Sequence, residues 1–201
     1  MFGKKSLASL ALGALLMPVA LFSQEENPAY KNEASVQAFG SFVRSTVQDG
    51  VQQSATNSGG VLASYRFFFD RNNGVEVNYG YARNTQRYGL TGGPLGLRTD
   101  SHEATADYIF RLPMKHWSPF ALAGVGGVVF APLNFADANA QARAAFVYGG
   151  GADFNVTSHI FVRAEYRGFV YKSPTYDVAG LSGLDRIAHR AEPSVGFGFR
   201  F

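Results

Sequence analysis

The residue types that a nucleophile and its general base require occur two positions apart in the sequence His116-Trp117-Ser118. On a strand this spacing would place the histidine and serine side chains on one face. The next acidic residue is Asp137, so no third group of a catalytic triad is close in sequence. The other histidines are scattered: His102, His159 and His189. With no cysteine in the chain, these residues predict neither an enzyme nor a metal site, and no cofactor is expected.

Charged residues that alternate with apolar ones form a second set, with Arg163, Glu165 and Arg167 as its clearest run. On strands, such residues would all point to one side of the sheet. If that side is the interior, they must form ion pairs, because an isolated buried charge is very costly. The predicted interior network consists of Arg66, Glu76, Glu103, Asp107, Arg111, Asp153, Arg163, Glu165, Arg167 and Arg200. This network is interpreted as a structural plug, and the alternative is a switchable network that opens a thin path for ions.

Two glycine-rich segments, residues 124–127 and 149–151, resemble phosphate-binding loops only superficially. Neither is followed by the Lys-Ser/Thr pair that a P-loop requires. Within strands, they are expected to ease curvature and interior crowding.

The first residues have the pattern of an exported protein. Two lysines, Lys4 and Lys5, precede an apolar stretch from Leu7 to Phe22, which is typical of a cleavable signal peptide over residues 1–23. Its removal leaves 16 basic and 15 acidic residues, so the basic pI gives no support for nucleic-acid binding. Residues 24–34 are expected to form a periplasmic N-terminal segment. No later run reaches the roughly 20 apolar residues of a membrane-spanning helix, so any membrane span must consist of strands.

Period-two patterning predicts eight strands in residues 35–201, each close to the ~9–11 residues that a tilted transmembrane strand needs. Their ranges are 35–45, 59–69, 74–84, 102–112, 119–130, 143–154, 159–171 and 190–201. Short connections at 70–73, 113–118 and 155–158 alternate with longer ones at 46–58, 85–101, 131–142 and 172–189. This rhythm is typical of an outer-membrane barrel with periplasmic turns and extracellular loops.

The two faces of the predicted strands differ in side-chain size. A soluble barrel would have to bury many large aromatic residues in a narrow interior, whereas a transmembrane barrel would turn them toward lipid. The predicted lipid-facing aromatics are Tyr65, Phe67, Phe69, Tyr79, Tyr81, Tyr108, Phe110, Phe154 and Tyr166. A girdle of aromatic residues around the barrel is expected near the short turns, with Phe120 at its level and Trp117 close to it. The facing of the first and fifth strands stays open, because Ala and Gly occupy both sides, and Pro193 is tolerable only at the outer end of its strand.

The chain ends in SVGFGFRF, in which Phe197, Phe199 and Phe201 share one face of a strand. Together with the signal peptide, the eight alternating segments and the stretch FVRAEYRGF, this ending resembles the OmpA/OmpX-type eight-stranded outer-membrane barrels over the whole mature chain. The resemblance implies an all-β, closed, antiparallel up-and-down transmembrane barrel in the outer membrane of a Gram-negative-type bacterium. It also implies that Phe197, Phe199 and Phe201 form the signal that the outer-membrane assembly machinery reads.

The resemblance leaves several functions open. The expected role is structural or surface-interacting, through the extracellular loops of a monomer. The alternatives are a narrow gated porin-like channel and a lipid A-modifying enzyme, because the His-x-Ser spacing is similar to that of lipid A deacylases. Outer-membrane lipid, lipopolysaccharide and the outer-membrane assembly machinery are the expected partners. Basic loop residues could meet lipopolysaccharide phosphates, although solvated loop charge is the commoner explanation for such residues. They are Arg87, Arg98, Lys172 and Arg186. No nucleic-acid partner is expected.

Overall fold

The computed structural model describes residues 30–44, 46–48, 51–90, 93–133, 140–173 and 187–201. The predicted signal peptide and most of the predicted periplasmic segment lie outside these residues. In the described part of the chain, no helix is long and apolar enough to cross a membrane.

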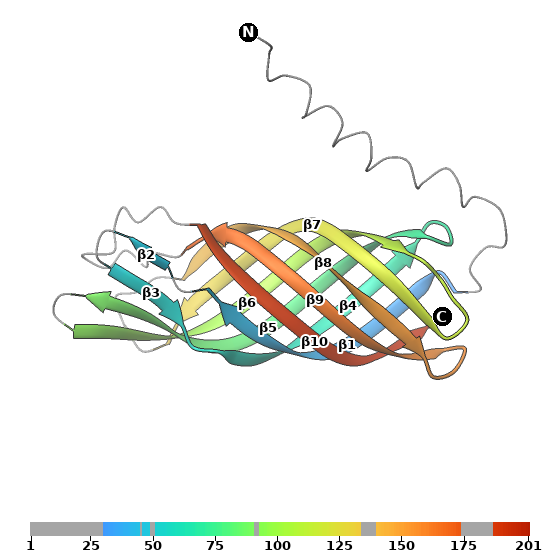
Figure 1. Ribbon diagram of the computed structural model, residues 1–201, viewed down its shortest axis with the longest axis horizontal. Coiled ribbons are helices and arrows are strands. Elements are labelled where there is room, and N and C mark those ends of the chain that lie inside the picture. Colours follow the sequence, from blue (N-terminus) through green and yellow to red (C-terminus); the bar gives the residue numbers. More distant parts are fainter. Residues whose placement is uncertain (1–29, 45, 49–50, 91–92, 134–139, 174–186) are drawn as a thin grey trace, which may run out of the picture.

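The described residues form an antiparallel sheet of ten strands, β1 to β10 (Figure 1). The bounds are β1 Asn32–Val43, β2 Thr46–Gln48, β3 Val51–Ala55, β4 Ser58–Phe68, β5 Asn73–Leu90, β6 Gly93–Arg111, β7 Trp117–Pro132, β8 Gln141–Asn155, β9 Ile160–Lys172 and β10 Ile187–Arg200. All strands except β2 and β3 follow one another around a barrel, and β5 pairs with β6 to close it. The predicted eight-stranded closed barrel is therefore confirmed, and closure removes the unpaired edges that hydrocarbon would not tolerate.

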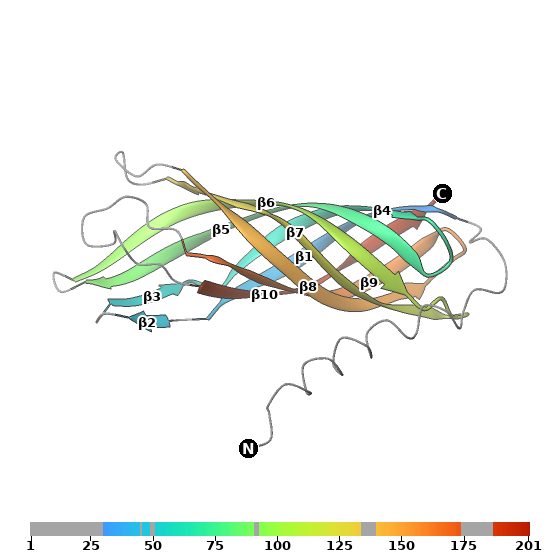
Figure 2. The ribbon, with the colours of Figure 1, turned by 90° about the horizontal axis from the view of Figure 1, so that it is seen from above.

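The two ends of the barrel differ. At the turn end, short connections join β4 to β5, β6 to β7 and β8 to β9, and the C-terminus of the chain lies beside them (Figures 1 and 2). The first of these turns is held by Asp70, whose carboxylate accepts hydrogen bonds from the backbone N–H groups of Asn72 and Asn73, both at 2.8 Å. Such Asx-type bonds fix a tight turn locally.

The loop end carries more strand structure than the sequence predicts. β5 and β6 continue as a paired hairpin to Leu90 and Gly93, within the range 85–101 that was predicted to be a loop. β3 pairs with β5 from Gln52–Gly89 to Ala55–Gln86, and β2 pairs with β3. The prediction of a simple loop at 46–58 is therefore also wrong. These strands project past the barrel as an outer hairpin, which consists of residues 86–90 and 93–97 together with β2 and β3 (Figure 2).

Alternation along the strands decides which side chains lie inside. In β1, Ser35, Gln37 and Phe39 are buried, whereas Val36 is exposed. In β7, Phe120 and Leu122 are buried on either side of the exposed Ala121. These patterns show which side chains of β1 and β7, the first and fifth predicted strands, face the interior. The sequence had left this open.

Two local predictions need correction. Phe120 was expected in the girdle of aromatic residues outside the barrel, but it is 6% exposed and lies inside. In β7, the residues that face the interior are the even-numbered ones around Phe120. Pro193 pairs with Tyr166 within β10 rather than ending the strand. On its other side, the pairing of β10 with β1 lapses between Phe39–Ser194 and Phe42–Ala191. That local interruption accommodates a residue without a backbone donor.

Candidate functional site

The barrel interior contains the densest group of charged side chains in the described residues. All ten predicted interior charges are buried there: Arg66, Glu76, Glu103, Asp107, Arg111, Asp153, Arg163, Glu165, Arg167 and Arg200. Three further charged residues, Glu33, Arg190 and Glu192, are buried with them. Six arginines thus face seven carboxyl groups, and the set of thirteen is called the interior network.

One half of the interior network lies toward the turn end and centres on Glu33. Its carboxylate accepts hydrogen bonds from Arg111 at 2.5 Å, Arg200 at 2.8 Å and Arg163 at 3.1 Å. Arg163 also donates two hydrogen bonds to Asp153, at 2.6 and 2.9 Å. This two-point geometry matches the planar guanidinium to a carboxylate and adds directional preference to the charge attraction.

Arg66 connects this half to the middle of the barrel. Its guanidinium pairs with Glu76 and donates to Glu165 at 3.1 Å. Nearby Asp107 accepts hydrogen bonds from Asn78 at 2.8 Å and from Thr105 at 2.9 Å. In the described residues, no arginine lies within ion-pair distance of Asp107, so amide and hydroxyl donors solvate it instead.

The other half lies toward the loop end. Glu103 accepts hydrogen bonds from both Arg167 and Arg190, and these two arginines also pair with Glu192 at 3.0 and 2.8 Å. Two arginines and two carboxylates therefore form a closed cycle. Each charge has two opposite neighbours, which offsets part of the cost of taking it out of water.

Aromatic rings complete the interior packing. The guanidinium carbon of Arg111 lies 3.5 Å from the centre of the Phe68 ring. That of Arg66 lies 4.0 Å from the centre of the Phe120 ring. Phe161 and Phe169 lie in the same way beneath Arg200 and Arg190, each at 4.4 Å. Flat guanidinium groups stack on such faces, so these phenylalanines fill space that ion pairs alone would leave.

The missed residues have a simple sequence signal. Glu33 precedes the predicted start of its strand at residue 35. Glu192 was not among the predicted interior charges, but it is fully buried. Counting back by twos from Arg200 reaches Glu192 and Arg190, so the period of the last strand places both inside.

The predicted lipid-facing aromatics lie on the outside of the barrel. Seven are exposed: Tyr65, Phe67, Phe69, Tyr79, Tyr108, Phe154 and Tyr166. Tyr81 and Phe110 are half-buried against neighbouring strands. The terminal Phe197, Phe199 and Phe201 are also exposed on the outer face. Trp117 stacks on Phe154 near the turn end, with ring centres 6.5 Å apart.

The possible catalytic pair is not assembled. Ser118 is buried inside the barrel, whereas His116 is exposed in the turn before β7. No hydrogen bond between them is found in the described residues. Nor does that part of the chain contain a group of three or more His, Cys, Asp or Glu residues that could hold a metal ion.

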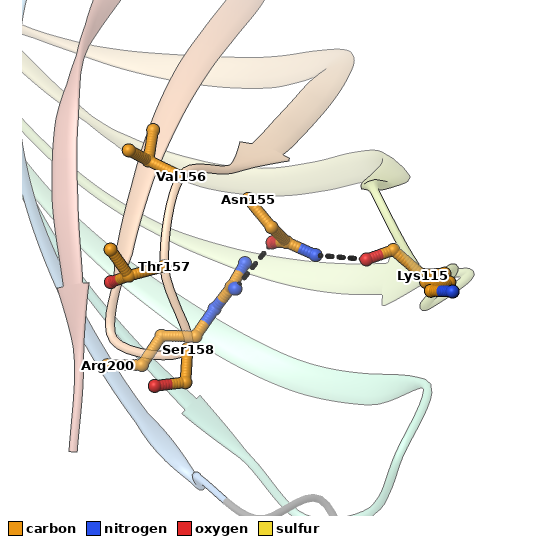
Figure 3. Close-up of a pocket in the computed structure, with 6 residues that line it drawn as sticks. All are labelled: Lys115, Asn155, Val156, Thr157, Ser158 and Arg200. Atoms are coloured by element: carbon orange, nitrogen blue, oxygen red, sulfur yellow. Dashed lines mark hydrogen bonds between the residues drawn. The ribbon is translucent and has the colours of Figure 1, made fainter.

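A polar cavity of about 310 Å³ lies at the turn end, lined by Lys115, Asn155, Val156, Thr157, Ser158 and Arg200 (Figure 3). Asn155 crosses it by donating to the Lys115 carbonyl at 3.3 Å and accepting from Arg200 at 2.6 Å. Because Arg200 also pairs with Glu33, the hydrogen bond from Arg200 to Asn155 joins the turn to the interior network. Structural hydrogen bonds therefore already cross this polar cavity.

Comparisons with known proteins agree with this architecture. The solved structure of the outer membrane protein OprG from Pseudomonas aeruginosa matches with a TM-score of 0.62 and 14% identity, covering 87% of this chain and 97% of that one. Neisserial surface protein A matches with a TM-score of 0.60 and 14% identity, covering 85% and 97%. At these identities the likeness concerns the fold alone.

Sequence comparison gives a curated relative and a family. A segment of 83 residues is 29% identical to the 25 kDa outer-membrane immunogenic protein of Brucella canis, and it covers 41% of this chain but only 38% of that protein. Residues 8–201 match the family model described as outer membrane protein beta-barrel domain. The match covers nearly the whole chain and the barrel has the same architecture as the solved outer-membrane barrels, so this chain belongs to the outer membrane protein beta-barrel domain family and is a protein of the outer membrane.

Proposed function

We propose that this protein is a closed outer-membrane barrel that presents its outer hairpin and loops at the cell surface, in a structural or surface-interaction role. The observation that carries this proposal is the interior network, which spans the lumen in two linked halves. Eight strands leave an interior only wide enough for side chains, and here arginines, carboxylates and phenylalanines occupy it. A filled lumen supports a function on the outside of the barrel.

The outer hairpin supports a surface role. In this family, longer connections face the cell exterior and short turns face the periplasm. The strand pairing of β5 with β6 continues past Arg83–Asp100 to Leu90–Gly93, and β3 supports it from the side. Binding residues often lie on connecting segments that a rigid scaffold positions, which favours a surface role for the outer hairpin.

Cysteine labelling on intact cells tests the orientation, because the chain has no cysteine of its own. Gln86→Cys, in the outer hairpin, is expected to react with a membrane-impermeant maleimide on whole cells. Asn72→Cys, in the opposite turn, is the matched control and is expected to react only after permeabilisation. The reverse pattern would contradict the proposal.

Conductance measurements distinguish the closed barrel from a narrow gated pore. In planar bilayers, the folded wild-type protein is expected to show no discrete current steps. Stepwise currents that disappear in Glu165→Gln would instead support an ion path through the interior network and overturn the closed barrel.

A further inference from the structure

Asp107 is the carboxyl group of the interior network that has no arginine partner among the described residues. It lies on β6 and is 2% exposed. A row of paired residues crosses the barrel wall at its level, from Arg66 of β4 through Glu76 of β5 to Asp107. One cation in this row thus faces two carboxyl groups. Arg66 is already engaged elsewhere, because it pairs with Glu76 and with Glu165, the latter at 3.1 Å.

The two strands next to this row supply no further cation for Asp107 among the described residues. On β7, Asp107 pairs with Gly124, which has no side chain. On β6 itself, the nearest inward charges along the strand are Glu103 and Arg111. Glu103 is also acidic, and Arg111 pairs with Glu33 at 2.5 Å.

The arginines on the opposite side of the lumen are engaged as well. Arg167 of β9 is the charged group that acts on Asp107 from across the interior, but it pairs with both Glu103 and Glu192. Arg143 of β8 is half-buried nearer the loop end and donates to Gln141 at 2.6 Å. An ionised Asp107 would therefore be a buried negative charge with no cation of its own, which is costly.

The hydrogen bonds around Asp107 also fit a neutral acid better than a carboxylate. The Asn78 side-chain nitrogen carries two hydrogens but lies near three oxygens: Glu76 Oε1 and Asp107 Oδ2, both at 2.8 Å, and Thr105 Oγ1 at 3.2 Å. Asp107 Oδ1 accepts no hydrogen bond from the described residues. A bare, buried carboxylate oxygen costs more than a bare carbonyl oxygen. With a proton on Oδ2, the 2.9 Å contact would become a donation from Asp107 to the Thr105 hydroxyl.

From this arrangement we propose that Asp107 is a proton-binding site of the barrel interior. Its carboxyl group keeps a proton at about pH 5, where an ordinary aspartate is ionised, and releases it as the pH rises. Release leaves two carboxylates, those of Asp107 and Glu76, directly opposite each other on β6 and β5, which weakens the barrel at this level. The site lies in the interior and does not depend on the surface role of the outer hairpin.

Infrared spectroscopy of the folded protein at about pH 5 tests the proposal, because a protonated carboxyl group has a C=O stretching band that a carboxylate lacks. A detergent without ester groups keeps lipid carbonyls out of this band. Asp107→Asn is expected to remove part of the band. The matched control is Asp100→Asn on the same strand, which is expected to leave the band unchanged, because Asp100 accepts two hydrogen bonds from Arg83 and is ionised. Heat-modifiable migration on gels checks that each variant is folded.

The pH dependence of stability gives a second measurement. A group that binds its proton more tightly in the folded than in the unfolded protein stabilises the fold at low pH, and this contribution is lost as the pH rises and the folded protein releases the proton. Between about pH 5 and pH 8, the urea midpoint of the wild type is therefore expected to fall relative to that of Asp107→Asn. The difference between the wild type and Asp100→Asn is expected to stay constant.

Two results would overturn the proposal. One is an infrared band that Asp107→Asn leaves intact, and the other is a pair of urea midpoints, for the wild type and Asp107→Asn, that move in parallel with pH. An intact band together with a wild-type midpoint that falls when sodium ions are replaced by a bulky organic cation would also overturn it, and would assign a bound metal cation to Asp107 instead.

Discussion

Arginine side chains hold the barrel interior together because each can bond to carboxylates on different strands at once. Arg163 of β9 reaches Asp153 on β8 and Glu33 near the start of β1, and so connects strands that are far apart in sequence. A lysine could not reproduce this planar, multi-point geometry. The network therefore fixes the relative positions of strands as well as balancing charge.

Removing Arg163 is expected to be strongly destabilising. In Arg163→Met, Glu33 and Asp153 each lose a cation in the interior, and leaving such charges uncompensated costs about 3–5 kcal/mol. The measurement is the free energy of unfolding by urea in lipid vesicles, with Trp117, the one tryptophan of the chain, as the fluorescent probe. The matched control is Arg83→Met, because Arg83 also pairs with an aspartate but is half-exposed, and little change is expected. Equal losses in the two variants would contradict the structural role of the interior network.

Charged residues of the site could be predicted where the alternation of a strand is clean. The run through Arg163, Glu165 and Arg167 shows its period directly. Glu192 shows it only by counting back by twos from Arg200, because the positions between them are occupied by Gly198, Gly196 and Ser194, which carry no charge. The partners of each charge could not be predicted, since pairs such as Arg111–Glu33 join residues 78 positions apart across the lumen.

At the scale of elements, the sequence predicts the membrane-crossing part of each strand but not its length outside. Within the membrane, one face must be apolar, and this produces the period-two signal. Beyond it, the sequence need not keep one face apolar, and polar neighbours such as Gln86 and Arg87 interrupt the alternation. The strand pairing of β5 with β6 nevertheless continues without a break to Leu90–Gly93.

Close strand packing explains the glycine run of β8. A Cβ built on Gly151 would lie 2.9 Å from both the Phe120 ring and the Glu165 backbone, inside the normal contact distance. Gly151→Val is therefore expected to destabilise the barrel by about 1–3 kcal/mol or more through overpacking. Gly127→Val is the matched control, since the nearest atom to its Cβ would be 3.9 Å away. Urea unfolding monitored by circular dichroism compares them, and a larger loss at Gly127 would refute the packing argument.

At the scale of the whole molecule, the usual arrangement of a soluble protein is inverted. Charged groups fill the centre, while large apolar side chains such as Val125, Tyr79 and Phe197 are exposed on the outside. In water, such a surface would drive aggregation, whereas in a bilayer it contacts acyl chains. An apolar outer wall therefore fits lipid rather than water as its surroundings, which agrees with membership of an outer-membrane family.

Two valines with almost equal exposure test this view of the outer surface. Val125, in the middle of β7, is 64% exposed, and Val156, in a short turn, is 63% exposed. If lipid surrounds the middle of the barrel, Val125→Arg should lower the free energy of unfolding in lipid vesicles by about 2–4 kcal/mol, because arginine is costly at the bilayer midplane. Val156→Arg should lower it by about 0–1 kcal/mol, because the turn lies at the interface. In a soluble barrel, both valines would be on a hydrated surface and both substitutions would be nearly neutral. Circular dichroism of each variant across a urea series therefore separates the two cases, and equal stability of the two variants would argue against a membrane-embedded wall.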